Sequence, residues 1–423
     1  YNYVEIMPLC EYPCDESWGY QDTGYFSPTS RYGKPEELKS FVDQCHQGGI
    51  GVILDFVPVH FAVNDYALAE YDGTALYEYP NMAVGRNEWG SCNFMHSRGE
   101  VCSFLQSSAY YWMKEFHFDG LRMDAVGNLI YWQGDQQRGE NLAALKFIRT
   151  MNQGLKERIP ECLLFAEDST PYQGVTKPVW EGGLGFDYKW DLGWMHDTLS
   201  YFQADANERR EKYHKLTFSM MYFYNERYIL PLSHDEVVHG KATIAQKMNG
   251  GYDGKFPQAR AFYMYMYAHP GAKLNFMGNE LAQLKEWCEK DELDWGLLKF
   301  PIHEAFHKFM ADLNKCYLKN NAFFQRDFTQ GGFCWVDCHQ EQKCMYLFER
   351  ISGEQKVLAV FNFSDETQEY TLEKDYAGYE LLLASDMVKY GGKKRYTKKE
   401  KEIKGGKAVF KMGPFSARYY LVK

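Results

Sequence analysis

The sequence predicts an α/β fold in which a (β/α)8 TIM barrel is followed by a C-terminal antiparallel β-sandwich. Short apolar strands alternate with amphipathic helices through most of the chain, and we count seven β-then-α units without an internal repeat. Runs such as residues 52–57 (VILDFV) are apolar at nearly every position, which is typical of strands buried on both faces of a parallel sheet. After residue 321 the hydrophobic period changes to two, as in antiparallel strands.

The first elements show how the units begin. Residues 3–8 (YVEIMP) form a short apolar strand, and residues 10–33, rich in Tyr, Pro and Gly, are expected to form a long functional loop. Pro35 is placed to open a helix at its first turn, and Gly48-Gly49 to end it. The strand at residues 52–57 follows directly, so the first complete αβ step is clear in the sequence.

The alternation continues to about residue 320. The expected helices are residues 103–116, 140–158, 258–269 and 304–317, and the expected strands are residues 118–126, 162–166, 185–189, 227–232 and 273–277. The strand at 118–126 is expected to start from an Asp-Gly turn. Strands at 333–336, 344–348 and 357–361 build the sandwich. We therefore predict a barrel domain at residues 1–320 and a sandwich domain at residues 321–423.

Composition narrows the possible partners and compartment. The chain has 423 residues, 45% of them hydrophobic, which is enough for a large core and a second small domain. The net charge of −10 argues against a nucleic-acid or anionic-membrane partner, and no long apolar span predicts a membrane segment. Eleven scattered cysteines show no recurring pair spacing. Free thiols in a reducing cytoplasm are the favoured interpretation.

Two charged residues lie at the end of the strand at 118–126. Arg122 and Asp124 are two positions apart, so on a strand they point to the same side. A guanidinium beside a carboxylate keeps that carboxylate ionised, which suits a covalent nucleophile. A plain strand-end salt bridge explains the pair equally well, so other residues must decide.

Other predicted strands also end in polar groups. Asp55 and His60, Glu167, and His234 with Asp235 follow three of them. The C-terminal strand ends of a barrel meet on one rim, where several carboxylates are costly to desolvate without a function. A metal-binding carboxylate ring is the competing interpretation. We rank it lower, because Arg122 would repel a cation there, and expect no metal.

Two carboxylates in different surroundings are the equipment of a retaining glycosidase. Asp124 has the arginine that favours ionisation, whereas Glu167 follows an apolar Leu-Leu-Phe-Ala approach that favours the protonated form. This asymmetry assigns the nucleophile to Asp124 and the acid/base to Glu167. We expect the two carboxyl groups about 5–5.5 Å apart and the pKa of the acid raised toward ~6–7.

These residues lie in segments that resemble the four signatures of glycoside hydrolase family 13, the α-amylase family. The segments are residues 55–60 (DFVPVH), 120–126 (GLRMDAV), 165–168 (FAED) and 232–236 (LSHDE), in that order. The resemblance implies that Asp124 is the nucleophile, that Glu167 is the acid/base and that Asp235 stabilises the transition state.

Further segments are similar to the glucan-branching members of that family, namely residues 17–21 (SWGYQ), 29–33 (TSRYG), 234–240 (HDEVVHG) and 276–280 (FMGNE). The resemblance implies a transferase that cleaves an α-1,4-glucan and attaches the segment to a 6-hydroxyl, as in glycogen branching, without a cofactor. Tyr20 would stack on the sugar at the cleavage point, His60 and His234 would bind its hydroxyls, Asp55 would support His60, and Arg122 would complete the substrate-binding set. A hydrolase of the same family (amylase, debranching enzyme or maltooligosyl-trehalose hydrolase) and an inactive glucan-binding fragment remain the alternatives.

The chain departs from the family pattern in three places. It begins at what would be the second barrel strand, so we expect the first strand and helix to be absent, and with them the N-terminal carbohydrate-binding sandwich of branching enzymes. Val59 stands where calcium-dependent amylases carry an asparagine. The resemblance therefore implies no structural calcium.

Overall fold

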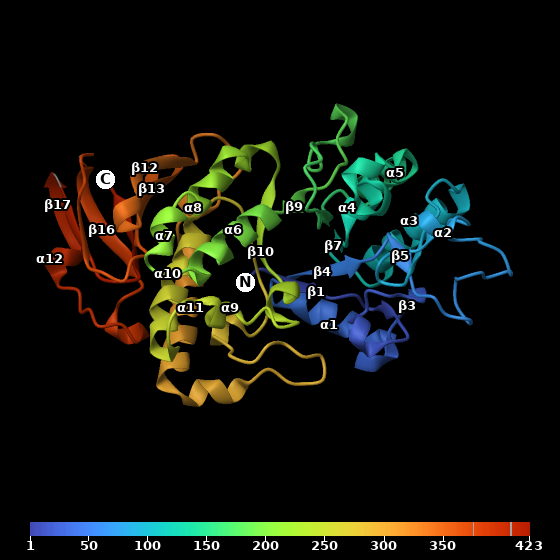
Figure 1. The fold of residues 1–423 in the computed structure, drawn as a ribbon, viewed down its shortest axis with the longest axis horizontal. Coiled ribbons are helices and arrows are strands. Elements are labelled where there is room, and N and C mark those ends of the chain that lie inside the picture. The colour runs from blue at the N-terminus through green and yellow to red at the C-terminus, as the bar shows by residue number, and fades with distance from the viewer. Residues whose placement is uncertain (375, 407) are drawn as a thin grey trace. The chain divides into compact units, whose positions relative to one another are not determined.

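The computed structural model describes residues 1–374, 376–406 and 408–423 (Figure 1). The chain divides into two compact units. Unit 1 contains Tyr1–Trp190 and Asn225–Arg227, and unit 2 contains Asp191–Tyr224 and Tyr228–Lys423. The predicted domain boundary at residues 320/321 therefore does not coincide with the division between compact units. The boundary between a barrel domain and a sandwich domain stays a prediction.

Unit 1 is built on five parallel strands. Their order is β1 (Tyr3–Ile6), β4 (Gly51–Phe56), β7 (Gly120–Met123), β8 (Leu163–Ala166) and β9 (Tyr188–Trp190). Phe56 pairs with Met123, and Met123 pairs with Ala166. Because neighbouring strands end in register, the residues that follow them are brought to one edge of the sheet.

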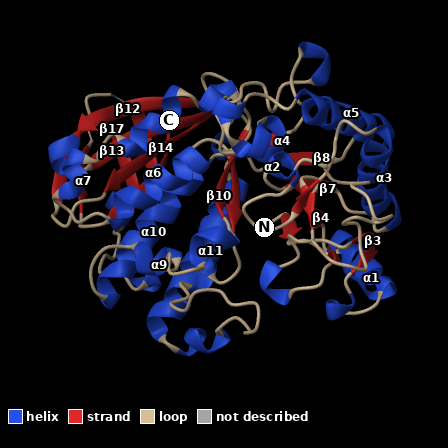
Figure 2. Ribbon diagram, turned by 45° about the vertical axis from the view of Figure 1, so that its right-hand side comes forward, coloured by secondary structure: helices blue, strands red, loops and turns tan. Residues whose placement is uncertain are grey.

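Three long helices pack on these strands, α1 (Pro35–Gln47), α3 (Gly99–Glu115) and α5 (Leu142–Arg158) (Figure 2). One buried cluster joins helix residues such as Trp112 and Ile148 to strand residues such as Leu54 and Leu121. Two short helices, α2 (Met82–Gly85) and α4 (Val126–Ile130), lie between the longer elements. The strand and helix order predicted for this part of the chain is confirmed.

The expected loop at residues 10–33, and the segment between β4 and α3, contain short strands. β2 (Cys10–Glu11) pairs with β3 (Gly24–Pro28), and β5 (His60–Phe61) pairs with β6 (Cys92–Asn93). Three of these strands have only two residues, which is too short for a pattern to be found in a sequence.

The prediction of an Asp-Gly turn at residues 119–120 was wrong, because Gly120 lies in a strand. It is the first residue of β7, and a Cβ atom there would lie 2.4 Å from the carbonyl oxygen of Leu163. The glycine is therefore needed for the close approach of β7 to β8. Asp119, the other residue of the expected turn, accepts a hydrogen bond of 2.6 Å from the backbone N–H of Val52.

Unit 2 holds two parallel strands, β10 (Tyr228–Leu232) and β11 (Ala272–Asn275), with the helices α6 (Leu192–Gln203), α10 (Tyr252–Ala268) and α11 (Pro301–Lys319). The shorter helices are α7 (Glu208–Glu211), α8 (Lys215–Phe218), α9 (Ile244–Lys247) and α12 (Lys398–Lys401). Helix α6 was not predicted. Helix α10 begins at Tyr252 and continues through Pro257, where the sequence had suggested a start at residue 258.

The C-terminal part of unit 2 is antiparallel. A six-stranded sheet has the order β12 (Phe333–Gln340), β13 (Met345–Ser352), β14 (Gln355–Asn362), β19 (Ser416–Val422), β16 (Tyr376–Ala384) and β17 (Glu402–Gly406). A second sheet pairs β15 (Gln368–Thr371) with β18 (Val409–Met412). Leu358 and Tyr420 of the large sheet share a buried cluster with Phe410 of the small one, so the two sheets form the predicted sandwich.

The other face of the large sheet packs on helix α10. Tyr265 of the helix shares a buried cluster with Phe348, Phe361 and Tyr419 of the sheet. Arg350, fully buried on β13, donates a hydrogen bond of 2.7 Å to the carbonyl oxygen of Ala268 at the end of the helix. The helix and the sheet therefore share one core.

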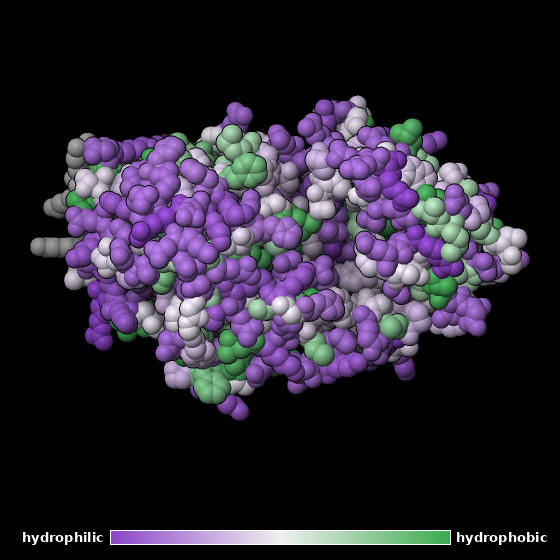
Figure 3. All heavy atoms as spheres, in the orientation of Figure 1, coloured by the Kyte–Doolittle hydropathy of each residue, from purple (hydrophilic) through white to green (hydrophobic). Residues whose placement is uncertain are grey.

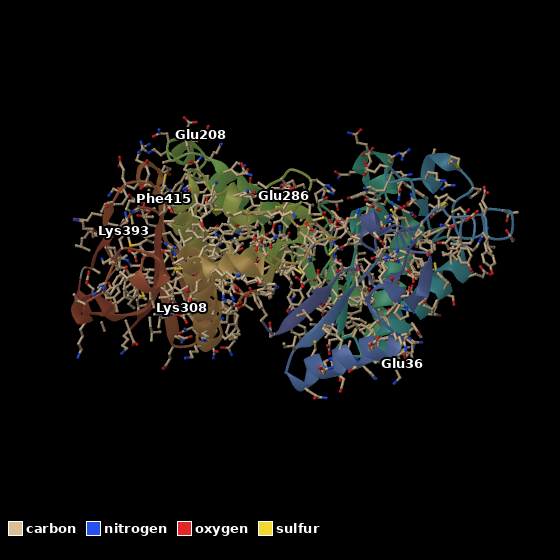
Figure 4. All side chains as sticks on the ribbon, turned by 90° about the horizontal axis from the view of Figure 1, so that it is seen from below. Glu36, Glu208, Glu286, Lys308, Lys393 and Phe415 are labelled. Carbon is tan, nitrogen blue, oxygen red and sulfur yellow. The ribbon has the colours of Figure 1, made fainter. Side chains whose placement is uncertain are left out.

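Exposed charged side chains occur in both units. Figure 3 shows a mostly hydrophilic face on which apolar residues occur in small, scattered groups. Glu36 on α1, Glu208 on α7 and Lys308 on α11 are all exposed (Figure 4). Among the helices of the described residues, none combines the length and apolar character that crossing a bilayer requires.

His96 in unit 1 makes stability depend on pH. It is buried, packs 4.8 Å from the ring of Phe147, and its Nε2 lies 2.9 Å from the Pro58 carbonyl. Burial lowers the pKa of His96 to about 4. The unfolded chain, with an ordinary histidine pKa of ~6.5, takes up this proton first, so the histidine costs stability as pH falls from about 6.5 to 4.

We expect His96→Gln to reduce the loss of unfolding free energy between pH 7 and pH 4 by about 3 kcal/mol, since a shift of one pKa unit corresponds to ~1.4 kcal/mol. Urea unfolding at both pH values measures this difference. His307→Gln changes an exposed histidine on α11 and should leave the pH dependence as it is. Equal pH dependence in wild type and His96→Gln would show that His96 is not the proton acceptor.

Candidate active site

Arg122 is the centre of the polar group at the strand ends of unit 1. It lies on β7 with only 1% of its side chain exposed. Its Nη1 donates to Asp55 Oδ2 at 2.9 Å and to Asp124 Oδ1 at 3.0 Å, so the predicted contact between Arg122 and Asp124 is confirmed. Its guanidinium carbon lies 4.3 Å from the ring centroid of Trp190, the last residue of β9. Two carboxylates and an aromatic face hold the guanidinium in one position.

Glu167 reaches the same guanidinium from β8. Its Oε2 lies 3.9 Å from Nη2 of Arg122 and accepts a hydrogen bond of 2.7 Å from the backbone N–H of Ala125. Ala125 presents that N–H from a left-handed conformation, with φ of 48°, directly after Asp124. The sequence had suggested an apolar setting for Glu167. Strand β8 is indeed buried, but the carboxylate itself has polar partners.

Asp124 and Glu167 differ from the other members of the group in exposure. Their side chains are 16% and 23% exposed, whereas those of Arg122 and Asp55 are 1% and 2% exposed. Both carboxylates also follow their strands by one residue. The two groups expected to do chemistry are therefore more exposed to a substrate than the buried pair Arg122 and Asp55 on which they rest.

Tyr20 connects the buried carboxylate of Asp55 to His60. Its hydroxyl donates a hydrogen bond of 2.5 Å to Asp55 Oδ2, and its carbonyl oxygen lies 2.8 Å from His60 Nε2. Within the described residues, His60 Nδ1 has no hydrogen-bond partner. Asp55 is thus linked to His60 through Tyr20. The support of His60 by Asp55 that the resemblance implies stays a prediction.

His60 is neutral in this setting. Burial lowers its pKa to about 4, so at neutral pH the imidazole carries one proton. A carbonyl oxygen can only accept, so that proton lies on Nε2 and Nδ1 is left as an acceptor. The ring of Trp89 lies beside it, with ring centroids 5.2 Å apart.

Sequence reasoning missed Glu5 and Asp22. Burial, and next the charge of Asp55, raise the pKa of Glu5 well above its usual range. Burial, and next Asp124, do the same for the carboxyl of Asp22, which is 0% exposed and has no hydrogen-bond partner among the described residues. A glutamate inside the apolar run at residues 3–8 was a signal for Glu5. Nothing in the loop sequence marked Asp22.

Two charged residues, Lys189 and Glu226, fix the loop that follows Glu167. Lys189 Nζ lies 2.8 Å from Asp168 Oδ2 and donates to the Thr170 carbonyl at 2.9 Å. The carboxylate of Glu226 accepts hydrogen bonds from the backbone N–H groups of Gly174, Val175 and Thr176 at 2.6, 2.9 and 2.7 Å. The acid/base candidate therefore stands at the start of an anchored loop, which sequence patterns did not indicate.

His234 and Asp235 belong to unit 2. They open the short helix η8 (His234–Val237), which is separated from the end of β10 by Ser233. The Asp235 side chain is 55% exposed and the His234 side chain 8%, and His234 Nε2 lies 3.6 Å from Asp235 Oδ1. Both follow a strand end, as predicted, and their functional roles stay predictions.

The described residues contain no group of three or more His, Cys, Asp or Glu side chains arranged to hold a metal ion. The carboxylates of Asp55 and Asp124 already share a guanidinium. The expected absence of calcium stays a prediction.

Known proteins match the chain along nearly its whole length. It is 44% identical over 408 residues to the 1,4-α-glucan branching enzyme GlgB of Marinobacter nauticus, covering 93% of this chain and 65% of the relative. It is 47% identical over 398 residues to the GlgB of Fusobacterium nucleatum, covering 93% and 64%. The chain is therefore similar to 1,4-α-glucan branching enzymes. It spans less than two thirds of the length of these relatives.

A family model and solved structures also match the chain. Residues 335–423 match the family model for the α-amylase C-terminal all-β domain. Solved α-amylases from Anoxybacillus and from Geobacillus thermoleovorans share the fold, with TM-scores of 0.70 and 0.72 at 16% and 15% identity. They cover all of this chain, and it covers 86% and 88% of them. The predicted fold class, a TIM barrel with a C-terminal antiparallel domain, is confirmed.

Proposed function

We propose that this chain carries out glycogen branching. It cleaves an α-1,4-glucan and transfers the released segment to a 6-hydroxyl, which forms an α-1,6 branch. The observation that carries the chemistry is the guanidinium of Arg122, which contacts both Asp124 and Glu167 at neighbouring strand ends. The substrate class comes from the relatives, which are named 1,4-α-glucan branching enzymes.

In the first step the Asp124 carboxylate attacks the anomeric carbon of the donor glucan. The glycosidic bond breaks, and the protonated carboxyl of Glu167 gives its proton to the leaving oxygen. A covalent glycosyl ester of Asp124 forms. Arg122 keeps the Asp124 carboxylate charged and directed toward the sugar, because its own position is fixed by Asp55 and Trp190.

In the second step Glu167, now a carboxylate, takes the proton from the 6-hydroxyl of an acceptor glucan. The oxygen of that hydroxyl attacks the anomeric carbon and Asp124 leaves, so two inversions retain the α configuration. Asp235 stabilises the positive charge on the sugar in both transition states. Tyr20 stacks on the ring at the cleavage point, and His60 and His234 bind its hydroxyls.

The proposed partner is an α-1,4-glucan, and no step needs a cofactor. We place the protein in a reducing, cytoplasmic setting. All eleven cysteines lie in the described residues and are free thiols.

Incubation with amylose, followed by iodine staining and a reducing-end assay, tests the proposal. We expect the stain to fade with few new reducing ends, and isoamylase treatment of the product to release short chains, because transfer makes one bond for each bond broken. Fading with a matching rise in reducing ends would identify a hydrolase of the same family. Glucan binding without any change in the stain would identify a binding protein.

A further inference from the structure

Trp89 is a large aromatic side chain that the reaction described above does not use. It belongs to the segment between α2 and β6, and it is 45% exposed. Its ring lies beside His60, with ring centroids 5.2 Å apart and planes inclined by 54°. His60, in contrast, is buried and bound to the Tyr20 carbonyl. An exposed aromatic ring therefore adjoins the residues that hold the sugar at the cleavage point.

The backbone around Trp89 is fixed from several sides. Gln21, next to Tyr20 in the chain, donates a hydrogen bond of 3.1 Å from Nε2 to the Trp89 carbonyl. The Trp89 N–H donates to Asn87 Oδ1 at 3.2 Å, and the same oxygen accepts the Ser91 N–H at 2.9 Å. Asn87 Nδ2 in turn donates to Asn93 Oδ1 on β6 at 3.2 Å. A ring on such a backbone loses little conformational freedom when a ligand stacks on it.

The exposed ring and the fixed backbone of Trp89 together suit a sugar ligand. Aromatic rings offer a flat apolar surface, and the faces of a glucose ring that carry only C–H bonds pack well on it. His60 and Gln21 tie the position of Trp89 to Tyr20, so a sugar on Trp89 would be a neighbour of the sugar on Tyr20 in one glucan chain.

We propose that Trp89 is a stacking platform for a glucose unit of the donor α-1,4-glucan, next to the unit held by Tyr20 and His60. This inference rests on the proposed function for the identity of the ligand. Trp89 acts in binding and in the choice of donor length, and it takes no part in bond breaking.

The test compares Trp89→Ala and Trp89→Phe with Trp180→Ala. Trp180, in η5 (Val179–Glu181), is 85% exposed and serves as the matched control. With amylose as donor we expect Trp89→Ala to raise KM about tenfold, as loss of one stacking contact would, and to lower kcat much less. Trp89→Phe should restore most of the affinity, and Trp180→Ala should match the wild type. A fall in kcat with unchanged KM would overturn the proposal.

A binding measurement separates this inference from the proposed function. In an Asp124→Ala background, the dissociation constant for maltoheptaose is measured by calorimetry with and without Trp89→Ala. We expect about tenfold weaker binding without the indole ring. An unchanged dissociation constant, or no maltoheptaose binding by the Asp124→Ala protein itself, would overturn the platform. A protein that binds as expected but hydrolyses amylose would overturn only the branching function.

Discussion

Replacing Asp124 with alanine is expected to abolish branching and any hydrolysis, with a loss of at least about 10⁴-fold in kcat, since the covalent intermediate can no longer form. The change should leave the fold intact, because the Asp124 side chain is 16% exposed and lies beyond the end of β7. Initial rates on amylose, with unfolding temperature as a check, measure both effects.

Azide makes this test specific to the nucleophile. In Asp124→Ala, azide fits the space left by the carboxylate, and with α-maltosyl fluoride it should attack the anomeric carbon as fluoride leaves. The product is then β-maltosyl azide, because only one inversion has occurred. Asp43→Ala, at an exposed carboxylate on α1, should keep full activity. Retained activity in Asp124→Ala, or an α-configured azide, would mean that another group is the nucleophile.

Arg122→Met is expected to have the largest combined effect on stability and activity. The change leaves Asp55, whose side chain is 2% exposed, without its cation, and breaking a buried ion pair in this way costs about 3–5 kcal/mol. It also releases Asp124 and removes the positive neighbour of Glu167, so kcat should fall by about 10²–10³-fold even when the protein is folded. Urea unfolding and amylose kinetics below the unfolding temperature measure the two effects separately.

Arg209→Met is the matched control for a buried arginine. Arg209 in unit 2 is 1% exposed and donates to the carbonyl oxygens of Ala204, Phe202 and Phe363. The Arg209→Met protein should therefore be less stable than the wild type, while its folded form keeps the wild-type kcat. If Arg122→Met also kept its kcat, the guanidinium would be a stabilising group only, as the plain salt-bridge interpretation of the sequence holds.

Long periodic segments could be predicted from the sequence because their patterns are local. Strands β4, β7, β8 and β10 were found within three residues of their ends, the usual uncertainty of element boundaries. The residues that follow β7 and β8 were therefore placed correctly, and Asp124 with Arg122 could be recognised as a pair. Residues that follow neighbouring parallel strands lie close together at one edge of the sheet, and this made the centre of the site predictable.

The surroundings of that centre could not be predicted in the same way. Trp89, Asp22 and Glu226 lie outside long periodic elements. Trp89 packs on His60, 29 residues away in the chain, Glu226 binds Gly174, 52 residues away, and Asp22 lies near Asp124, 102 residues away. The left-handed conformation of Ala125, which turns its N–H toward Glu167, leaves no mark in the residue type. Such features depend on contacts between distant segments, which periodicity does not encode.

The shared core of helix α10 and the large antiparallel sheet has a consequence for protein engineering. Tyr265 packs with Phe348 and Phe361, and Arg350 binds the end of the helix. Removing the strands from residue 333 onward would expose the apolar face of α10. Grafting those strands onto another enzyme would expose the face of the sheet that α10 covers here. The all-β region is therefore not an exchangeable module, and an attempt to vary donor preference by swapping it would have to carry α10 along.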